Sequence, residues 1–271
     1  MVRCRITSQQ PDVWRDCQQE HHDWIHSGRC LRQFLWLARS CCSDYHPDAA
    51  RLNFPPPNGE RPLRFKLVIF DFDGTLADSL GWFIGISDRL ADEFGFDRID
   101  KQQVATLRRH DAATLLKLHH VPLWKVPFIA ARFRMLMAKQ IRMIAPFPGV
   151  ADVLGQLAQA GATLAVVTSN SCANVRRVLG RKSAGLLVAC EGGVSIFGKR
   201  LKLRKVLRRS GIHPAQAIFI GDEIRDIEAA RHAGIASGAV AWGFTDLDAL
   251  KAHSPDMLFG SVGEMLSVLV G

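Results

Sequence analysis

The chain alternates short apolar runs with longer stretches in which apolar residues recur at helical spacing. The runs are bounded by polar or turn-forming residues, which is typical of buried strands. They lie at residues 66–70, 163–167, 186–189, 217–220 and 238–242. Because helical stretches separate them, the order of elements predicts an α/β fold with a parallel, doubly wound sheet.

One long interval, residues 78–146, interrupts this alternation and contains no convincing strand. Helical periodicity recurs within it at residues 78–94, 113–120 and 126–144. Pro146 and Pro148 mark the return to the sheet, because proline disfavours the continuation of a helix. The sequence therefore predicts a core domain from residues 64–79 and 147–271, with an inserted α-helical domain at residues 80–146.

Residues 1–63 differ in composition from the rest of the chain. They contain no lysine, hold five of the seven cysteines, and end in the turn-rich segment NFPPPNGERP, which is typical of a linker. A short amphipathic helix is compatible with the apolar spacing at residues 31–38. We expect a poorly ordered extension that is separate from the core.

Composition narrows the class of protein. A chain of 271 residues with 48% hydrophobic residues can bury a large core. It has no run of roughly 18 apolar residues and no apolar signal-peptide segment, so we expect a cytoplasmic protein without a membrane partner. With two cysteines in the body, a fold built on disulfides is not expected. The net charge of +9 favours an acidic partner, either a phosphorylated metabolite or a nucleic acid.

The segment KLVIFDFDGTLADS carries the most specific chemistry. Alternation along an extended chain directs Asp71 and Asp73 to the same side at the carboxyl end of a strand, and Gly74 permits a sharp turn after them. Two carboxylates about 5 Å apart repel by roughly 3 kcal/mol at an effective dielectric near 20. A divalent cation offsets this repulsion, and all-oxygen ligation favours Mg²⁺ over zinc.

The segment FDFDGTLADS resembles the first motif of the haloacid dehalogenase (HAD) superfamily, and three later segments follow in that superfamily's order. The resemblance implies that Asp71 is the nucleophile and that Asp73 donates a proton to the leaving group. The second segment, LAVVTSN, implies that Thr168 binds the transferred phosphoryl group, with Ser169 and Asn170 as further candidates for substrate binding. By itself, a strand that ends in Thr-Ser-Asn is also an ordinary helix cap.

The third motif of the superfamily is a lysine near the start of a helix. Lys199 precedes a helix whose predicted buried stripe is Leu203, Val206 and Leu207, and a lysine there opposes the helix dipole, which indicates function more than stability. Lys202 remains an alternative. No aromatic residue lies among the other cations of this helix, which favours a solvated helix face over a nucleic-acid site.

The fourth motif is AIFIGDEIRDIEAA, an apolar strand that runs into Asp222 and Asp226. The resemblance implies that Asp222 binds the metal together with Asp71 and the main-chain carbonyl of Asp73, and that Asp226 lies behind them or reaches the metal through water. A structural alternative, compatible with metal binding, is that Asp222 caps the following helix. Glu223 and Arg225 are expected to be surface residues.

The resemblance implies a phosphomonoester hydrolase that works through an aspartyl-phosphate. Because Asp73 is present, phosphate-ester chemistry is favoured over dehalogenation or phosphonate cleavage. The helical insert resembles the type-one cap of the phosphoglycolate phosphatases. Arg108, at a predicted helix end within it, is a candidate for substrate binding, with a surface charge as the alternative. A phosphomutase and a catalytically silent binding protein remain alternatives. The motifs choose neither the substrate nor between a monomer and a dimer.

Overall fold

The structure is a computed structural model that describes residues 63–193 and 198–270. The predicted extension, its linker and its short helix therefore lie outside the described residues, apart from Leu63.

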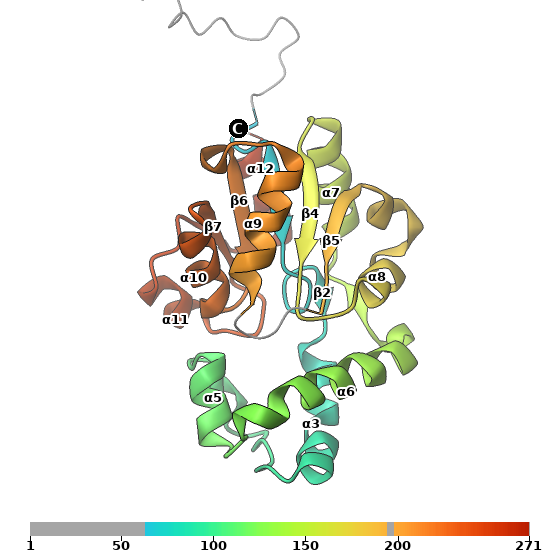
Figure 1. The fold of residues 1–271 in the computed structure, drawn as a ribbon, viewed down its shortest axis with the longest axis vertical. Coiled ribbons are helices and arrows are strands. Elements are labelled where there is room, and N and C mark those ends of the chain that lie inside the picture. Colours follow the sequence, from blue (N-terminus) through green and yellow to red (C-terminus); the bar gives the residue numbers. More distant parts are fainter. Residues whose placement is uncertain (1–62, 194–197, 271) are drawn as a thin grey trace, which may run out of the picture. The chain divides into compact units, whose positions relative to one another are not determined.

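Six parallel strands form the central sheet, in the order β5-β4-β1-β6-β7-β8 (Figure 1). The bounds are β1 Leu67–Phe70, β4 Thr163–Val167, β5 Leu187–Glu191, β6 Ala217–Gly221, β7 Ala236–Val240 and β8 Met257–Phe259. The five predicted strands and the doubly wound α/β class are confirmed. The edge strand β8 was not predicted, because three apolar residues are too short a run to indicate a strand.

The strand residues alternate between two buried faces of the sheet. Val68 and Phe70 point into a cluster with α7 (Val150–Gln159), α8 (Cys172–Gly185) and α12 (Val262–Leu269). The opposite face packs against α9 (Lys199–Ser210) and α10 (Ile224–Ala233), which cover the near side of the sheet in Figure 1. The predicted stripe Leu203, Val206 and Leu207 is buried there. A further helix, α11 (Leu247–Ala252), follows β7. Because both faces are covered, the ligand-accessible part of the sheet is its edge at the strand ends.

The helical insert lies between two short connecting segments. Its elements are α3 Leu80–Phe94, α4 Val104–Leu107, α5 Ala112–Leu118, η2 Leu123–Lys125, α6 Val126–Lys139 and η3 Ile141–Met143. The connections pair as a two-residue antiparallel ladder, β2 (Ala77–Asp78) with β3 (Ala145–Pro146), where no strand was expected. The last helix ends at Lys139, earlier than the predicted periodic stretch, since residues 141–143 tighten into a 3₁₀ turn.

The base of the insert is continuous with the hydrophobic core. Trp82, Leu136 and Met137 are buried in the same cluster as Val68 and Phe70 of β1. The Trp82 indole N–H also donates to the Gln140 side-chain oxygen at 2.8 Å, so α3 and the end of α6 are fixed to each other. This packing places the helical insert beyond the carboxyl ends of the strands, below the sheet in Figure 1.

Composition led to expectations about disulfides and about membrane-spanning segments, and the described residues bear on both. Cys172 at the start of α8 and Cys190 near the end of β5 form a disulfide, and the sheet and its flanking helices carry the rest of the fold. No helix in residues 63–193 and 198–270 is both long enough and apolar enough to cross a lipid bilayer.

Candidate active site

The candidate site lies where three neighbouring strands of the sheet end. Asp71 follows β1, Thr168 follows β4 and Asp222 follows β6, and all three residues are buried. Because β1 pairs in register with both β4 and β6, the strands carry these side chains to the same edge.

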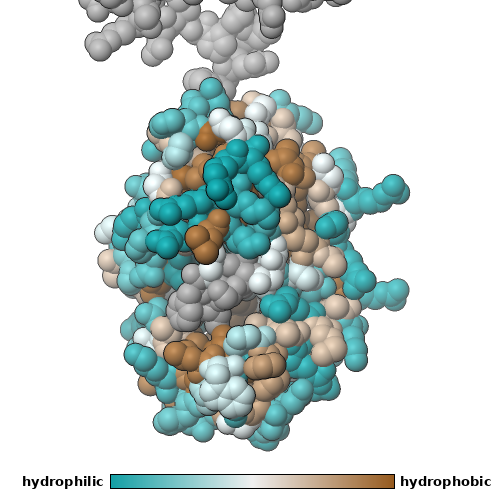
Figure 2. All heavy atoms as spheres, in the orientation of Figure 1, coloured by the Kyte–Doolittle hydropathy of each residue, from teal (hydrophilic) through white to brown (hydrophobic). Residues whose placement is uncertain are grey.

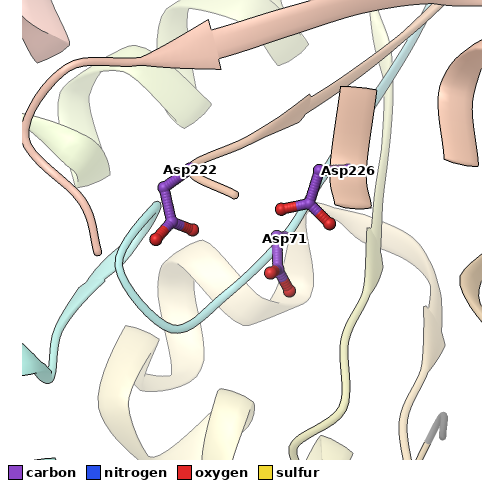
Figure 3. Close-up of side chains that lie close together, drawn as sticks. All are labelled: Asp71, Asp222 and Asp226. Atoms are coloured by element: carbon purple, nitrogen blue, oxygen red, sulfur yellow. The ribbon is translucent and has the colours of Figure 1, made fainter. Parts of the chain in front are cut away.

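Three carboxylates converge at this edge. One oxygen from each of Asp71, Asp222 and Asp226 lies within 4.8 Å of the others, and Figure 3 shows the three side chains close together. The turn after β1 needs glycine at position 74, where φ is +74° and a Cβ would overlap the Asp222 carboxylate. The close approach of the turn to Asp222 therefore explains why glycine follows the second aspartate.

Asp73 lies outside this acidic cluster. Its carboxylate accepts hydrogen bonds from the Ser79 hydroxyl at 3.1 Å and from the Asn170 side-chain amide at 2.9 Å. Burial raises the pKa of Asp73 to about 6, although the hydrogen bonds from Asn170 and Ser79 lower it. A carboxyl group with a raised pKa is suited to donating a proton near neutral pH.

Lys199, at the start of α9, directs its ammonium group into the acidic cluster. Its Nζ lies 2.5 Å from Asp71 Oδ2 and 2.5 Å from Asp226 Oδ1, and its side chain is 2% exposed. Burial alone would lower the pKa of Lys199, but Asp226 and Asp71 raise it above its ordinary value, so the group stays charged. Lys202 Nζ instead lies 3.0 Å from Glu191 Oε2. Lys205 and Arg209 also form ion pairs with Glu191, on the hydrophilic surface that Figure 2 shows over α9.

The geometry can be compared with known proteins. The family model described as "Haloacid dehalogenase-like hydrolase" matches residues 68–240, a segment that runs from β1 to the end of β7 and includes the helical insert and the acidic cluster. The chain belongs to the haloacid dehalogenase-like hydrolases. The predicted resemblance is therefore confirmed, and the cap-like insert is consistent with it.

Individual relatives of this hydrolase agree with the assignment. It is 36% identical to a phosphoglycolate phosphatase of Synechococcus elongatus over 205 residues, which cover 75% of this chain and 97% of the relative. It is 26% identical to an N-acetylmuramic acid 6-phosphate phosphatase of Pseudomonas aeruginosa, with 76% and 96% covered. A solved structure from Lactobacillus plantarum, titled a putative phosphoglycolate phosphatase, shares the fold with a TM-score of 0.65 at 20% identity, covering 76% of this chain and 100% of that one. The hydrolase is a phosphatase of the phosphoglycolate phosphatase-like group.

The charges at the site of this hydrolase fit a hard divalent cation. Burial raises the pKa of Asp71 to about 7, despite the opposing effect of Lys199, and burial also raises the pKa of Asp222 well above its ordinary value. Within residues 63–193 and 198–270, the buried Asp71 Oδ1 has no hydrogen-bond partner. Three buried carboxylates that converge, one of them with an unpartnered oxygen, supply oxygen ligands of the kind that Mg²⁺ prefers. The Asp73 main-chain carbonyl stays a predicted ligand.

The predicted substrate-binding residues make different hydrogen bonds in the structure. Thr168 accepts a hydrogen bond from the Asn170 N–H at 3.0 Å, and the Asn170 side chain binds Asp73, so this turn orients the predicted proton donor. The Ser169 carbonyl accepts from Arg134 of α6 at 3.1 Å. Arg108 donates to main-chain carbonyls of the core loop that follows β7.

The expectation that Glu223 and Arg225 are surface residues was wrong. Their side chains are 15% and 19% exposed, they form an ion pair at 2.5 Å, and Arg225 lowers the pKa of Asp71. Glu223, rather than Asp222, caps α10, in a reciprocal capping box with Asp226. The spacing Glu-x-x-Asp at a helix start could have indicated this box from the sequence.

Sequence reasoning also missed two hydroxyl groups at the site. Thr75 is fully buried and donates to Asp222 Oδ1 at 2.8 Å, and the buried Ser79 donates to Asp73. Both follow the Asp-x-Asp-Gly turn in the sequence, but the pattern of apolar and polar residues does not show which carboxylate each one contacts.

Proposed function

We propose that this enzyme is a Mg²⁺-dependent phosphomonoesterase that acts on a small, phosphoglycolate-like metabolite through an aspartyl-phosphate. The observation that carries the proposal is the position of Lys199 and the unpartnered Asp71 Oδ1 in one buried acidic cluster. A carboxylate nucleophile beside a fixed cation, within a site that favours a further cation, can accept a phosphoryl group despite its negative charge.

The proposed reaction uses two carboxyl groups in turn. Asp71 attacks phosphorus, the ester bond breaks, and Asp73 gives its proton to the departing oxygen. Asp73 then removes a proton from water as the water attacks the aspartyl-phosphate, which releases phosphate and restores Asp71. The raised pKa of Asp73 supports the first role, because part of the population carries a proton near neutral pH.

The remaining groups act on the charge of the phosphoryl group. Lys199 keeps one Asp71 oxygen in place and, together with the Thr168 hydroxyl, is the proposed binding group for the transferred phosphoryl oxygens. Asp71, Asp222, Asp226 and the Asp73 carbonyl are the proposed holders of Mg²⁺. When bound, the cation supplies electrostatic stabilisation of the phosphoryl oxygens.

A panel of phosphate esters tests this proposal. Release of inorganic phosphate is measured from phosphoglycolate, sugar phosphates and nucleoside monophosphates, with Mg²⁺ and with EDTA. We expect release that requires the cation and is greatest for phosphoglycolate, the ester named for the Synechococcus relative. Isomerisation of a sugar phosphate without phosphate release would favour the phosphomutase. Inert esters throughout would favour a silent binding protein.

Removing the cation should destabilise the enzyme more at high pH than at low pH. The pKa values of Asp71 and Asp73 rise from 3.8 to about 7 and about 6 in the fold, so unfolding releases protons between about pH 4 and pH 7. The stability of the cation-free protein therefore falls as the pH rises through this window. Thermal unfolding in EDTA should occur at a lower temperature at pH 8 than at pH 5.5.

Mg²⁺ at about a hundred times its dissociation constant should raise the unfolding temperature by roughly 5 to 10 °C at pH 8, and by less at pH 5.5. Each Mg²⁺ sample is compared with EDTA at the same pH, which cancels the titration of groups outside the site. An equal increase at both pH values would contradict the assignment of the cation to these carboxylates.

A further inference from the structure

Arg108 of the helical insert is fixed to a loop of the core by three hydrogen bonds. It follows α4, and its Nε and Nη2 donate to the carbonyls of Phe244 at 3.0 Å and Gly243 at 2.7 Å. In return, the Asp246 N–H donates to the Arg108 carbonyl at 2.7 Å. The planar guanidinium group, with two parallel donors, thus holds two consecutive carbonyls in a defined orientation.

The same loop contacts Asp222 with its other side. The Phe244 N–H donates to Asp222 Oδ2 at 2.8 Å, and the Thr245 N–H donates to the Asp222 carbonyl at 3.3 Å. Gly243 packs so closely that a Cβ there would overlap the Asp222 side chain. The peptide groups of this loop therefore bind Arg108 through their carbonyls and Asp222 through their amides.

The two oxygens of Asp222 are held differently. Oδ1 accepts from Thr75, which belongs to the core turn after β1, whereas Oδ2 accepts from Phe244, whose loop is fixed by the insert. The Phe244 ring also lies 6.1 Å, between centroids, from the ring of Phe83 in α3. The orientation of the Asp222 carboxylate thus depends in part on contacts from the helical insert.

We propose that Arg108 is a positioning residue that, through the Phe244 amide, orients the Asp222 carboxylate for a divalent cation. This inference rests on the proposed function, since it assigns Asp222 to the cation. It gives Arg108 a role other than direct contact with the substrate. The position of the helical insert on the core then affects the affinity of the core for the cation.

Arg134 provides a matched comparison. Like Arg108, it belongs to the helical insert and donates to a core carbonyl, that of Ser169. Ser169 makes no hydrogen bond to Asp222 among the described residues. Replacement of Arg134 should therefore remove a contact between insert and core without disturbing Asp222. Arg109, which is exposed beside Arg108, controls for the loss of a positive charge.

The experiment measures cation binding without substrate. Mg²⁺ is titrated calorimetrically into the full-length wild type and the Arg108→Met, Arg109→Met and Arg134→Met variants. Loss of a group that orients a metal ligand costs about 10- to 100-fold in affinity, so we expect roughly tenfold weaker binding for Arg108→Met and a change below about twofold for the other two. Hydrogen exchange at the Phe244, Thr245 and Asp246 amides should be faster in Arg108→Met alone.

Kinetics separate positioning from substrate contact. At saturating Mg²⁺, Arg108→Met should keep a KM for the ester within about twofold of wild type, while its apparent constant for Mg²⁺ rises by roughly tenfold. Wild-type Mg²⁺ affinity in Arg108→Met, or a raised KM at every Mg²⁺ concentration, would overturn the inference while the proposed function stands. A wild-type enzyme that binds no cation would overturn both.

Discussion

Asp71→Asn should lower phosphate release by at least about a thousandfold, because the amide cannot serve as the nucleophile. The variant should remain folded. Asparagine has nearly the same size, and Lys199 keeps Asp226 as a partner at 2.5 Å. Steady-state phosphate release from the best ester of the panel, measured at saturating Mg²⁺, gives the loss of activity. Circular dichroism and thermal unfolding of the same preparation give the state of the fold.

The covalent intermediate provides a second test of Asp71. Wild-type enzyme quenched with acid during turnover of a ³²P-labelled ester should retain label on the protein, and Asp71→Asn should retain none. Asp73→Asn is the matched control, since it keeps the nucleophile and removes only the proposed proton donor. Activity in Asp71→Asn within about tenfold of wild type would rule out this aspartate as the nucleophile.

The elements that the sequence predicted well are those defined by local patterns. The central strands β1, β4 and β6 are apolar runs whose alternate residues face two buried surfaces, as at Val68 and Ile69, so each run is visible without knowledge of its neighbours. The strands that escaped prediction are the short ones. The three residues of β8, and the two-residue ladder at Ala77 and Pro146, are defined by pairing with distant segments.

The candidate site also has features that a local pattern reveals and features that it does not. Asp71 and Asp222 could be found because each acid directly follows an apolar strand, and parallel strands bring their ends together. The contacts that orient these acids join residues far apart in sequence. Asn170 binds Asp73 across 97 positions, and Arg108 binds Phe244 across 136 positions. No local pattern encodes such pairs, so their roles emerge only from tertiary packing.

Lys199→Met should reduce both activity and stability, whereas Lys202→Met should affect neither strongly. Removing one partner of a buried ion pair costs about 3 to 5 kcal/mol, and Lys199 is the cation between two buried carboxylates. Lys202 is half-buried, and Glu191 would keep Lys205 and Arg209 as partners. The two lysines lie three positions apart on one helix, so this pair of variants determines which one serves the site.

The stability loss in Lys199→Met should depend on pH. Without the ammonium group, the already raised pKa of Asp71 rises further, so its carboxyl becomes neutral at low pH and no longer needs a partner. The difference from wild type in the free energy of unfolding, measured in urea with EDTA present, should therefore be small at pH 5 and largest near pH 8. Equal losses for Lys199→Met and Lys202→Met at pH 8, in stability and in phosphate release, would contradict the assignment of Lys199. A loss confined to Lys202→Met would transfer the role to that residue.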